Sequence, residues 1–215
     1  MADRNFVRIP GFQADSLSLS TLEGIVNLLK THEINEVKFT GKHQISLPGV
    51  GQPTVQALSE GLQQLIPKDK ESTAHAPPAL TTIRTCPDTV NCKHGIRDIN
   101  PITDRLNAIA LPGKLPAKVK VSVAGCKMCC TAPFIRDIGL IAEQKGWKLI
   151  FGGNGGSRPR IGDVIAAGLS DEQAIELILR CLIVYVENAK PKMRTARFME
   201  SYGAMRFKSE VLAMS

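Results

Sequence analysis

Two cysteine-bearing turns constrain this chain more than any other feature of its sequence. RTCPDTVNC holds Cys86 and Cys92 with five residues between them, and VAGCKMCC holds Cys126, Cys129 and Cys130 within five positions. A short β-like segment precedes each turn, and a turn after a strand can point two thiols inward. We therefore expect a fold that brings two strand ends together, with their cysteines facing one another.

Four thiolates from two such turns can enclose a cubane iron–sulfur cluster, because soft sulfur ligands suit iron in a sulfide-bridged cluster. Pro87 stiffens the first turn. A structural zinc site is an alternative, although its paired cysteines usually have about two to four residues between them. A redox pair at Cys126 and Cys129 is another, but CTAPFIRDIGL does not begin a clean helix after it. Buried free thiols are the last alternative, and this one suits Cys181 on the apolar face of a predicted helix.

Composition narrows the class of protein. The chain has 215 residues, enough for one compact domain or two small ones. Its 27 Lys and Arg outnumber 20 Asp and Glu, which favours an anionic partner, but 5% aromatic residues and no basic–aromatic patch argue against nucleic acid. No apolar run approaches the roughly 18 residues of a membrane helix, and the first residues lack a signal-peptide core. We expect a cytoplasmic protein, in which disulfides are disfavoured.

The pattern along the chain predicts two units joined by a linker. The first unit, residues 1–68, contains a predicted amphipathic helix at 17–31, a β-like segment at 35–47 and a second helix at 53–66. Residues 69–80 are polar and rich in proline, which is typical of a linker.

The second unit, residues 81–215, mixes strands and helices. Ser170 and Gln173 form a predicted capping box at the start of a helix, and Gly203 interrupts another helix near the end of the chain. The overall fold class is α+β. The predicted strands are 81–85, 118–125, 137–143 and 146–153, and the predicted helices are 96–111, 170–188 and 194–214.

The cysteine region resembles a known family. TCPDTVNC, followed by LPAKVKVSVAGCKMCC and DIGL, resembles the cofactor-binding region of the sulfite and nitrite reductases that carry sirohaem coupled to a [4Fe-4S] cluster. That family has C-x5-C, an LP-x-K-x-K strand, G-C-x3-C and D-I-G-L in this order. GWKLIFGGNGGSRPRIGDVIA is similar to its glycine-rich segment, and VKFTGKHQISLPGV to its ferredoxin-like half-domain.

The resemblance covers nearly the whole chain. It implies a ferredoxin-like half-domain followed by an α/β sirohaem/[4Fe-4S]-binding domain. Larger members carry this unit twice, so a single copy is most similar to the small assimilatory-type sulfite reductases. The resemblance also implies that Cys86, Cys92, Cys126 and Cys130 ligate the cluster and that Cys130 bridges to the sirohaem iron. Cys129 is then a bystander, with exchange of ligand roles with Cys130 as the alternative.

The resemblance also assigns an anion site. Lys118 and Lys120 are two apart on a strand and share one face, and they match the family's substrate-binding lysines; a solvated edge strand is the alternative. Lys42 stands where the family's T-x-R-Q motif has arginine. A lysine keeps the positive charge but lacks the bidentate guanidinium donor. Thr81 replaces another family arginine, and Arg84 is the expected substitute.

Sirohaem carries many carboxylates, so the protein needs cations and backbone donors around it. The glycine run GGNGG is a candidate for the backbone donors, with an ordinary turn as the alternative. The candidate sirohaem contacts are Thr40, Gln44, Arg136, Lys148, Gly152, Gly153, Asn154, Arg158 and Arg160, in addition to Cys130.

The implied reaction is the six-electron reduction of sulfite to sulfide. Reduction of nitrite to ammonia and a non-catalytic Fe–S/sirohaem electron-transfer role are the alternatives. The chain has no flavin or nicotinamide fingerprint, so we expect a separate electron-donor protein such as a ferredoxin. The other expected partner is a small oxyanion; nucleic acid and membrane are not expected, and the assembly is a monomer or small homo-oligomer.

Overall fold

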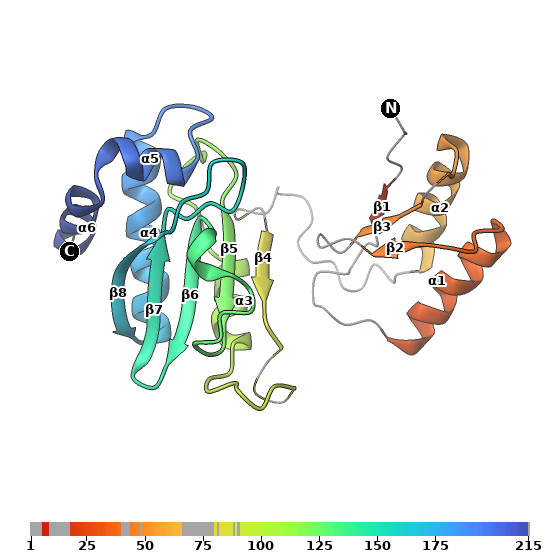
Figure 1. Ribbon diagram of the computed structural model, residues 1–215, viewed down its shortest axis with the longest axis horizontal. Coiled ribbons are helices and arrows are strands. Elements are labelled where there is room, and N and C mark those ends of the chain that lie inside the picture. Colours follow the sequence, from red (N-terminus) through yellow and green to blue (C-terminus); the bar gives the residue numbers. More distant parts are fainter. Residues whose placement is uncertain are drawn as a thin grey trace. The chain divides into compact units, whose positions relative to one another are not determined.

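The chain forms two compact units, residues 1–73 and 74–215, in a computed structural model (Figure 1). The structure describes residues 6–8, 18–39, 44–47, 49–65, 80, 82–87, 89 and 91–214. None of the helices within these ranges is long and apolar enough to cross a membrane. The predicted domain limits at 68 and 81 stay predictions.

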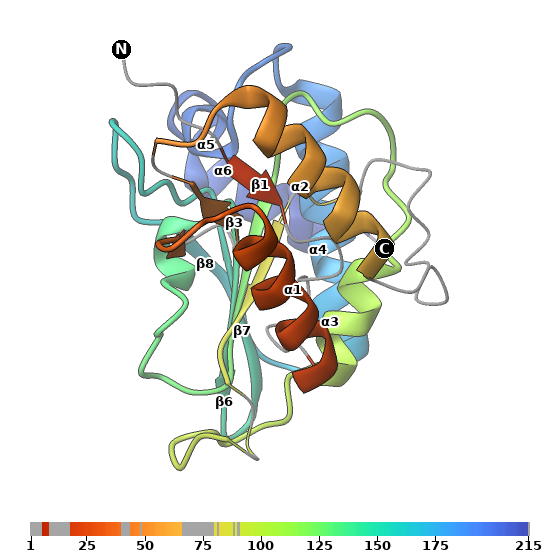
Figure 2. The ribbon, with the colours of Figure 1, turned by 90° about the vertical axis from the view of Figure 1, so that its right-hand side faces the viewer.

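The first unit joins a small antiparallel sheet to two helices. Its sheet has the strand order β1-β3-β2, and Figure 2 shows α1 and α2 side by side. Ser18 caps α1 by accepting a hydrogen bond from the backbone N–H of Thr21 at 3.1 Å. Both predicted helices are confirmed. The bounds are β1 Phe6–Arg8, α1 Leu19–Thr31, β2 Lys38–Phe39, β3 Gln44–Ser46 and α2 Gln52–Leu65.

The second unit is built on a five-stranded sheet in the order β4-β5-β6-β7-β8. The first three strands are parallel, and β7 and β8 are antiparallel additions. The predicted strand pair β6–β7 is confirmed, whereas β8 was not predicted, because Ile165 is its single buried residue and the apolar pattern is weak. The bounds are β4 Thr82–Thr85, β5 Lys120–Ala124, β6 Ile138–Glu143, β7 Gly146–Phe151 and β8 Asp163–Leu169.

Helices cover one face of this sheet. α4 lies against β7 and β8, and α6 packs on α4 (Figure 1). The capping box of Ser170 and Gln173 is confirmed at the start of α4, and Gly203, with φ 92°, ends α5 as the sequence predicts. Phe151 stacks on Phe207 at 4.9 Å in the core. The bounds are α3 Asn100–Asn107, α4 Asp171–Asn188, α5 Thr195–Tyr202 and α6 Ala204–Ala213.

The opposite face of the sheet carries the predicted site. The valines of β5 point into the helix-covered core, so Lys120 and Ser122 lie on the other face. A short 3-10 helix, η2 (Pro133–Ile135), packs on β5, β6 and β7. Any side chain at Gly139 would collide with the backbone of Pro133. The glycine of DIGL is therefore needed for η2 to approach the sheet.

Candidate cofactor and anion site

The two cysteine turns meet at the end of the sheet where β4 and β5 finish. β4 and β5 are parallel neighbours, so the segments that follow them leave the sheet at the same end. The backbone N–H of Cys86 donates to the carbonyl of Val123 at 3.3 Å, and the N–H of Gly125 donates to Cys86 Sγ at 3.1 Å. A cavity of about 80 Å³ lies between the turns, and all five of the turn cysteines line it. The predicted convergence of the thiols is confirmed.

The chemistry of this cavity suits an iron–sulfur cluster. Its lining is apolar apart from the five thiols and His94. Hydrogen bonds to sulfur, like the one from Gly125, tune the potential of such clusters. Among the residues that the structure describes, no three His, Cys, Asp or Glu side chains group as ligands of a single metal ion. Cys181 lies apart, fully buried in the core, where burial raises the pKa of its thiol.

Cys129 differs from its neighbours in its backbone. Its φ of 54° lies in the left-handed region, which disfavours residues with a Cβ. The carbonyl of Cys129 accepts a hydrogen bond from the N–H of Ala132 at 2.8 Å, which fixes this turn. Cys129 is half-buried, whereas the adjacent Cys130 is exposed. The turn therefore places two consecutive thiols in different surroundings.

We expect Cys129→Gly to raise the free energy of unfolding of the cofactor-free protein by up to about 1 kcal/mol, because glycine adopts a positive φ without the Cβ penalty. The midpoint of guanidinium-induced unfolding measures this effect. Cys129→Ala is the matched control, since alanine keeps the Cβ. An equal gain in the alanine variant would show that the backbone conformation is not the cause.

The lysine segment lies at the start of β5, the strand whose other end leads to the second cysteine turn. Val119, Val121 and Val123 are buried, so the predicted division of this strand into two faces is confirmed. The strand begins at Lys120, and Lys118 is an exposed residue just before it. β5 lies between β4 and β6, so the edge-strand alternative is wrong.

Arg84 belongs to the same face as the lysine of β5. It pairs with Ser122 in the parallel register of β4 and β5, and paired residues of neighbouring strands point to the same side. Ser122 in turn donates to the carbonyl of Thr131 at 3.0 Å, which folds the segment after Cys130 back over β5. The predicted arginine and the lysine of β5 therefore share one face of the sheet, and the segment after Cys130 folds back over that face.

Positive charge accumulates on this side. Burial lowers the pKa of Lys120, and the positive charges of Arg194, Lys118 and Arg136 lower it further. Burial also lowers the pKa of Arg136, with a contribution from Arg84. We call Arg84, Lys118, Lys120, Arg136 and Arg194 the cation face. Cations this close to one another favour the binding of a multiply charged anion.

Arg136 provides a test of fit for an anionic cofactor. Its Nε atom is buried and has no hydrogen-bond partner among the residues that the structure describes. A buried donor without a partner is costly, and a carboxylate would satisfy it. The cation face therefore fits a polycarboxylate as well as a small oxyanion.

The glycine-rich segment has a packing role within the chain, and its predicted contacts with sirohaem stay predictions. The N–H of Gly152 donates to the carbonyl of Asp137 at 2.8 Å, and the N–H of Asn154 donates to the carbonyl of Arg160 at 2.9 Å. Any side chain at Gly153 would collide with the backbone of Phe134 and Arg136. These glycines allow close packing on η2, and the amides of Gly152 and Asn154 are already used within the chain.

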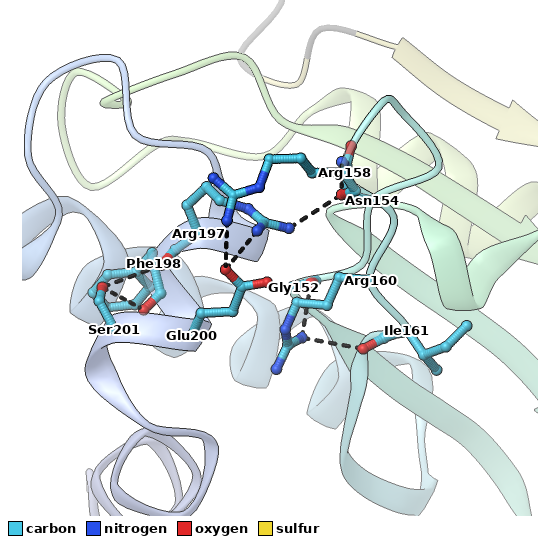
Figure 3. A network of polar contacts seen from close by, with 9 residues as sticks. All are labelled: Gly152, Asn154, Arg158, Arg160, Ile161, Arg197, Phe198, Glu200 and Ser201. Atoms are coloured by element: carbon cyan, nitrogen blue, oxygen red, sulfur yellow. Dashed lines mark hydrogen bonds and ion pairs between the residues drawn. The ribbon is translucent and has the colours of Figure 1, made fainter.

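The two arginines of this segment differ in the contacts that they make within the chain (Figure 3). Arg160 donates to the carbonyls of Gly152 at 2.8 Å and Ile161 at 3.1 Å, and it pairs with Asp163 at 2.5 Å. Arg158 is 74% exposed and lies 3.9 Å from Glu200, which also pairs with Arg197 at 2.5 Å. Arg160 thus stabilises the loop, whereas Arg158 is largely exposed and contacts Glu200 at the surface.

Other predicted contacts are less available or lie elsewhere. Lys148 pairs with Glu143 at 2.6 Å, and this lysine lowers the pKa of the carboxyl. Thr40 and Lys42 lie outside the described residues, and Gln44 belongs to β3, where the side chain is not described. Sequence reasoning missed Arg194, because no spacing links it to the lysines.

The comparisons with known proteins agree with this geometry. The profile of the nitrite and sulphite reductase 4Fe-4S domain matches residues 77–215. The assimilatory-type sulfite reductase of Nitratidesulfovibrio vulgaris is 30% identical over 204 residues, which are 95% of this chain and 91% of that protein. The chain belongs to the nitrite and sulphite reductase family. Members of this family are oxidoreductases that carry a [4Fe-4S] cluster and sirohaem, which confirms the predicted cofactors.

Other family members match over a smaller part of their length. The nitrite reductase [NAD(P)H] of Emericella nidulans is 30% identical over 194 residues, which are 90% of this chain and 17% of that protein. The structure of Mycobacterium tuberculosis NirA has a TM-score of 0.65 at 14% identity and matches 96% of this chain and 39% of its own. The structure of dissimilatory sulfite reductase I has a TM-score of 0.67 at 11% identity. The match covers 98% of this chain and 68% of that chain. These two likenesses confirm the α+β fold class.

Proposed function

We propose that this chain is a sulfite reductase, which reduces sulfite to sulfide in six electrons at a sirohaem coupled to a [4Fe-4S] cluster. The observation that carries the proposal is that residues of the cation face and the cysteine cavity are both built on the parallel strands β4 and β5. Sulfite is favoured over nitrite because the assimilatory-type sulfite reductase matches this chain over 91% of its own length.

Four of the cavity cysteines, Cys86, Cys92, Cys126 and Cys130, would hold the cluster, and Cys130 would also bind the sirohaem iron. Arg136 and the largely exposed Arg158 would pair with carboxylates of the sirohaem. When bound, the two cofactors supply electrons one at a time and an iron with an open position for the anion.

The side chains of the cation face would hold the substrate. Lys118, Lys120 and Arg84 provide two ammonium groups and a guanidinium, which would attract a small dianion. The reduction also consumes protons. The lowered pKa of Lys120 makes its ammonium a better proton donor than an ordinary lysine. A purely structural strand face would not need this concentration of positive charge.

Electrons would come from a separate donor protein such as a ferredoxin. The surface around the cysteine turns carries exposed Lys93 and Lys127 together with the exposed apolar side chains of Ile96 and Met128. A basic surface with an apolar centre suits an acidic partner. The working form would be a monomer or a small homo-oligomer.

Nitrite reduction is the second candidate function, because nitrite reductases match this chain with a similar identity of 30%. The experiment that tests both starts from anaerobically purified protein whose iron, sulfide and tetrapyrrole have been quantified. Methyl-viologen-linked turnover is then measured with sulfite and with nitrite. A higher kcat/KM for sulfite supports the proposal. A higher kcat/KM for nitrite would make nitrite reduction the function instead. A loaded protein that reduces neither anion would be an electron-transfer protein.

A further inference from the structure

A buried carboxylate, that of Asp137, contacts two residues of the cation face. Asp137 is 1% exposed and stands between η2 and β6. Its Oδ2 accepts the backbone N–H of Lys120 at 2.9 Å, and its Oδ1 accepts the hydroxyl of Thr195 at 2.5 Å. The guanidinium of Arg194 reaches both oxygens, with Nε 3.3 Å from Oδ1 and Nη2 paired with Oδ2. Three segments of the chain therefore meet at one side chain.

This arrangement fixes the start of β5. The pairing of β5 with β6 begins at Val121 and Ile138, one residue after Lys120. The N–H of Lys120 is bound by a side chain, so the backbone position of this lysine depends on Asp137. The N–H of Gly152 also donates to the Asp137 carbonyl at 2.8 Å. Any shift of Asp137 would thus move both the lysine and the glycine-rich segment.

Packing alone does not explain a charge at this place. A buried ion pair is often no more stabilising than apolar residues of the same volume, because desolvation of the charges is costly. Asp137 is, however, the anion among the groups that set the charge state of Lys120. We propose that Asp137 is a positioning residue of the oxyanion site, which anchors Lys120 and supplies the negative charge that balances the cations around it. This inference rests on the proposed function.

The direction in which Asp137 shifts the pKa of Lys120 follows from the charged groups that face Lys120. Lys118 on the same segment, Arg136 after η2 and Arg194 before α5 all favour loss of its proton, whereas the charge of Asp137 opposes it. From α4, Tyr185 is neutral at working pH, because burial raises the pKa of its hydroxyl to about 12. Arg84 on β4 acts on Arg136. Removal of the Asp137 charge must therefore lower the pKa of Lys120.

The test is Asp137→Asn in the holoenzyme, because asparagine keeps the shape and an oxygen that accepts the Lys120 N–H. The dissociation constant for sulfite, followed by its effect on the absorption spectrum, and KM for sulfite are measured between pH 6 and 10. The differences in KM and in the dissociation constant between the variant and the wild type should grow as the pH rises, because the charge of Asp137 opposes loss of the Lys120 proton. Loss of binding with rising pH should begin at least about half a pH unit lower in the variant. Glu143→Gln is the control, because it removes a carboxylate that pairs with Lys148.

A second readout does not depend on turnover. NMR of the full chain with ¹³C-labelled lysine follows the titration of the Lys120 signal, which Lys120→Arg identifies. Arg194→Met should shift this titration to higher pH and Asp137→Asn to lower pH, so the opposite signs test the idea even if one variant folds poorly. Parallel pH profiles and unchanged lysine titrations would overturn the inference. A wild-type protein that neither binds nor reduces sulfite would overturn the proposed function, while the NMR result would still decide the role of Asp137.

Discussion

Cys130→Ser is expected to remove most of the cluster-bound iron, whereas Cys129→Ser should leave it in place. The proposed ligands include Cys130, and a serine hydroxyl is a poor substitute for a thiolate in a sulfide-bridged cluster. The neighbouring Cys129 lies in the left-handed backbone region and faces different surroundings. Iron and acid-labile sulfide are measured on anaerobically purified protein, with about four cluster irons per chain expected for the wild type and for Cys129→Ser.

The pair of variants is a matched comparison, because the two positions are adjacent and the substitution is the same. Both variants should unfold at similar denaturant concentrations without cofactors, since neither thiol lies in the buried core. The opposite result, with iron lost from Cys129→Ser and kept in Cys130→Ser, would assign the fourth ligand to Cys129. Equal retention in both would show that the two thiols exchange roles.

Lys120→Met is expected to lower kcat/KM for sulfite by about 100-fold or more, the size typical of losing a positioned proton donor. The side chain loses its charge and its proton but keeps much of its apolar length. Methyl-viologen-linked turnover measures the loss, and the absorption spectrum of the same sample shows that both cofactors are still bound. Lys120→Arg keeps the charge and should recover substrate binding better than turnover, because guanidinium is a much weaker acid.

Lys145→Met is the control for a general effect of charge, because Lys145 is an exposed lysine in the turn between β6 and β7. It should leave kcat/KM within about twofold of the wild type, as expected for a surface substitution. An unchanged kcat/KM in Lys120→Met with normal cofactor content would remove Lys120 from the proposed site. The proposal would then depend on Arg84 and Lys118 alone.

The glycine-rich segment shows that one motif can serve packing, while its predicted contact with a cofactor stays a prediction. The run GGNGG was expected to offer backbone donors to a bound cofactor. Gly152 and Asn154 use these donors within the chain, and Gly153 is needed because η2 approaches it closely. A glycine that close packing requires and a glycine that the approach of a ligand requires cannot be distinguished from the sequence. The difference lies in what the backbone touches.

The sequence by itself determined the local features of this protein. The spacing of Cys86, Cys92, Cys126 and Cys130 predicted two turns at strand ends, and the alternation of Val119, Val121 and Val123 predicted the two faces of β5. Helix α4 was predictable from its capping box. These features depend on residues within a few positions of one another, where the periods of strand and helix and the chemistry of turns act directly.

Only the tertiary structure decided which distant residues complete the site. Asp137 and Arg194 are 57 positions apart, and their contact depends on the path of the chain through β6, β7, β8 and α4. The alignment of Arg84 with Ser122 depends on the register of two parallel strands. Such contacts follow from the packing of whole elements against a common core, which no local spacing encodes. This is why the family resemblance of two local cysteine turns could propose the ligands of the cluster, while nothing in the sequence could propose the residues that position Lys120.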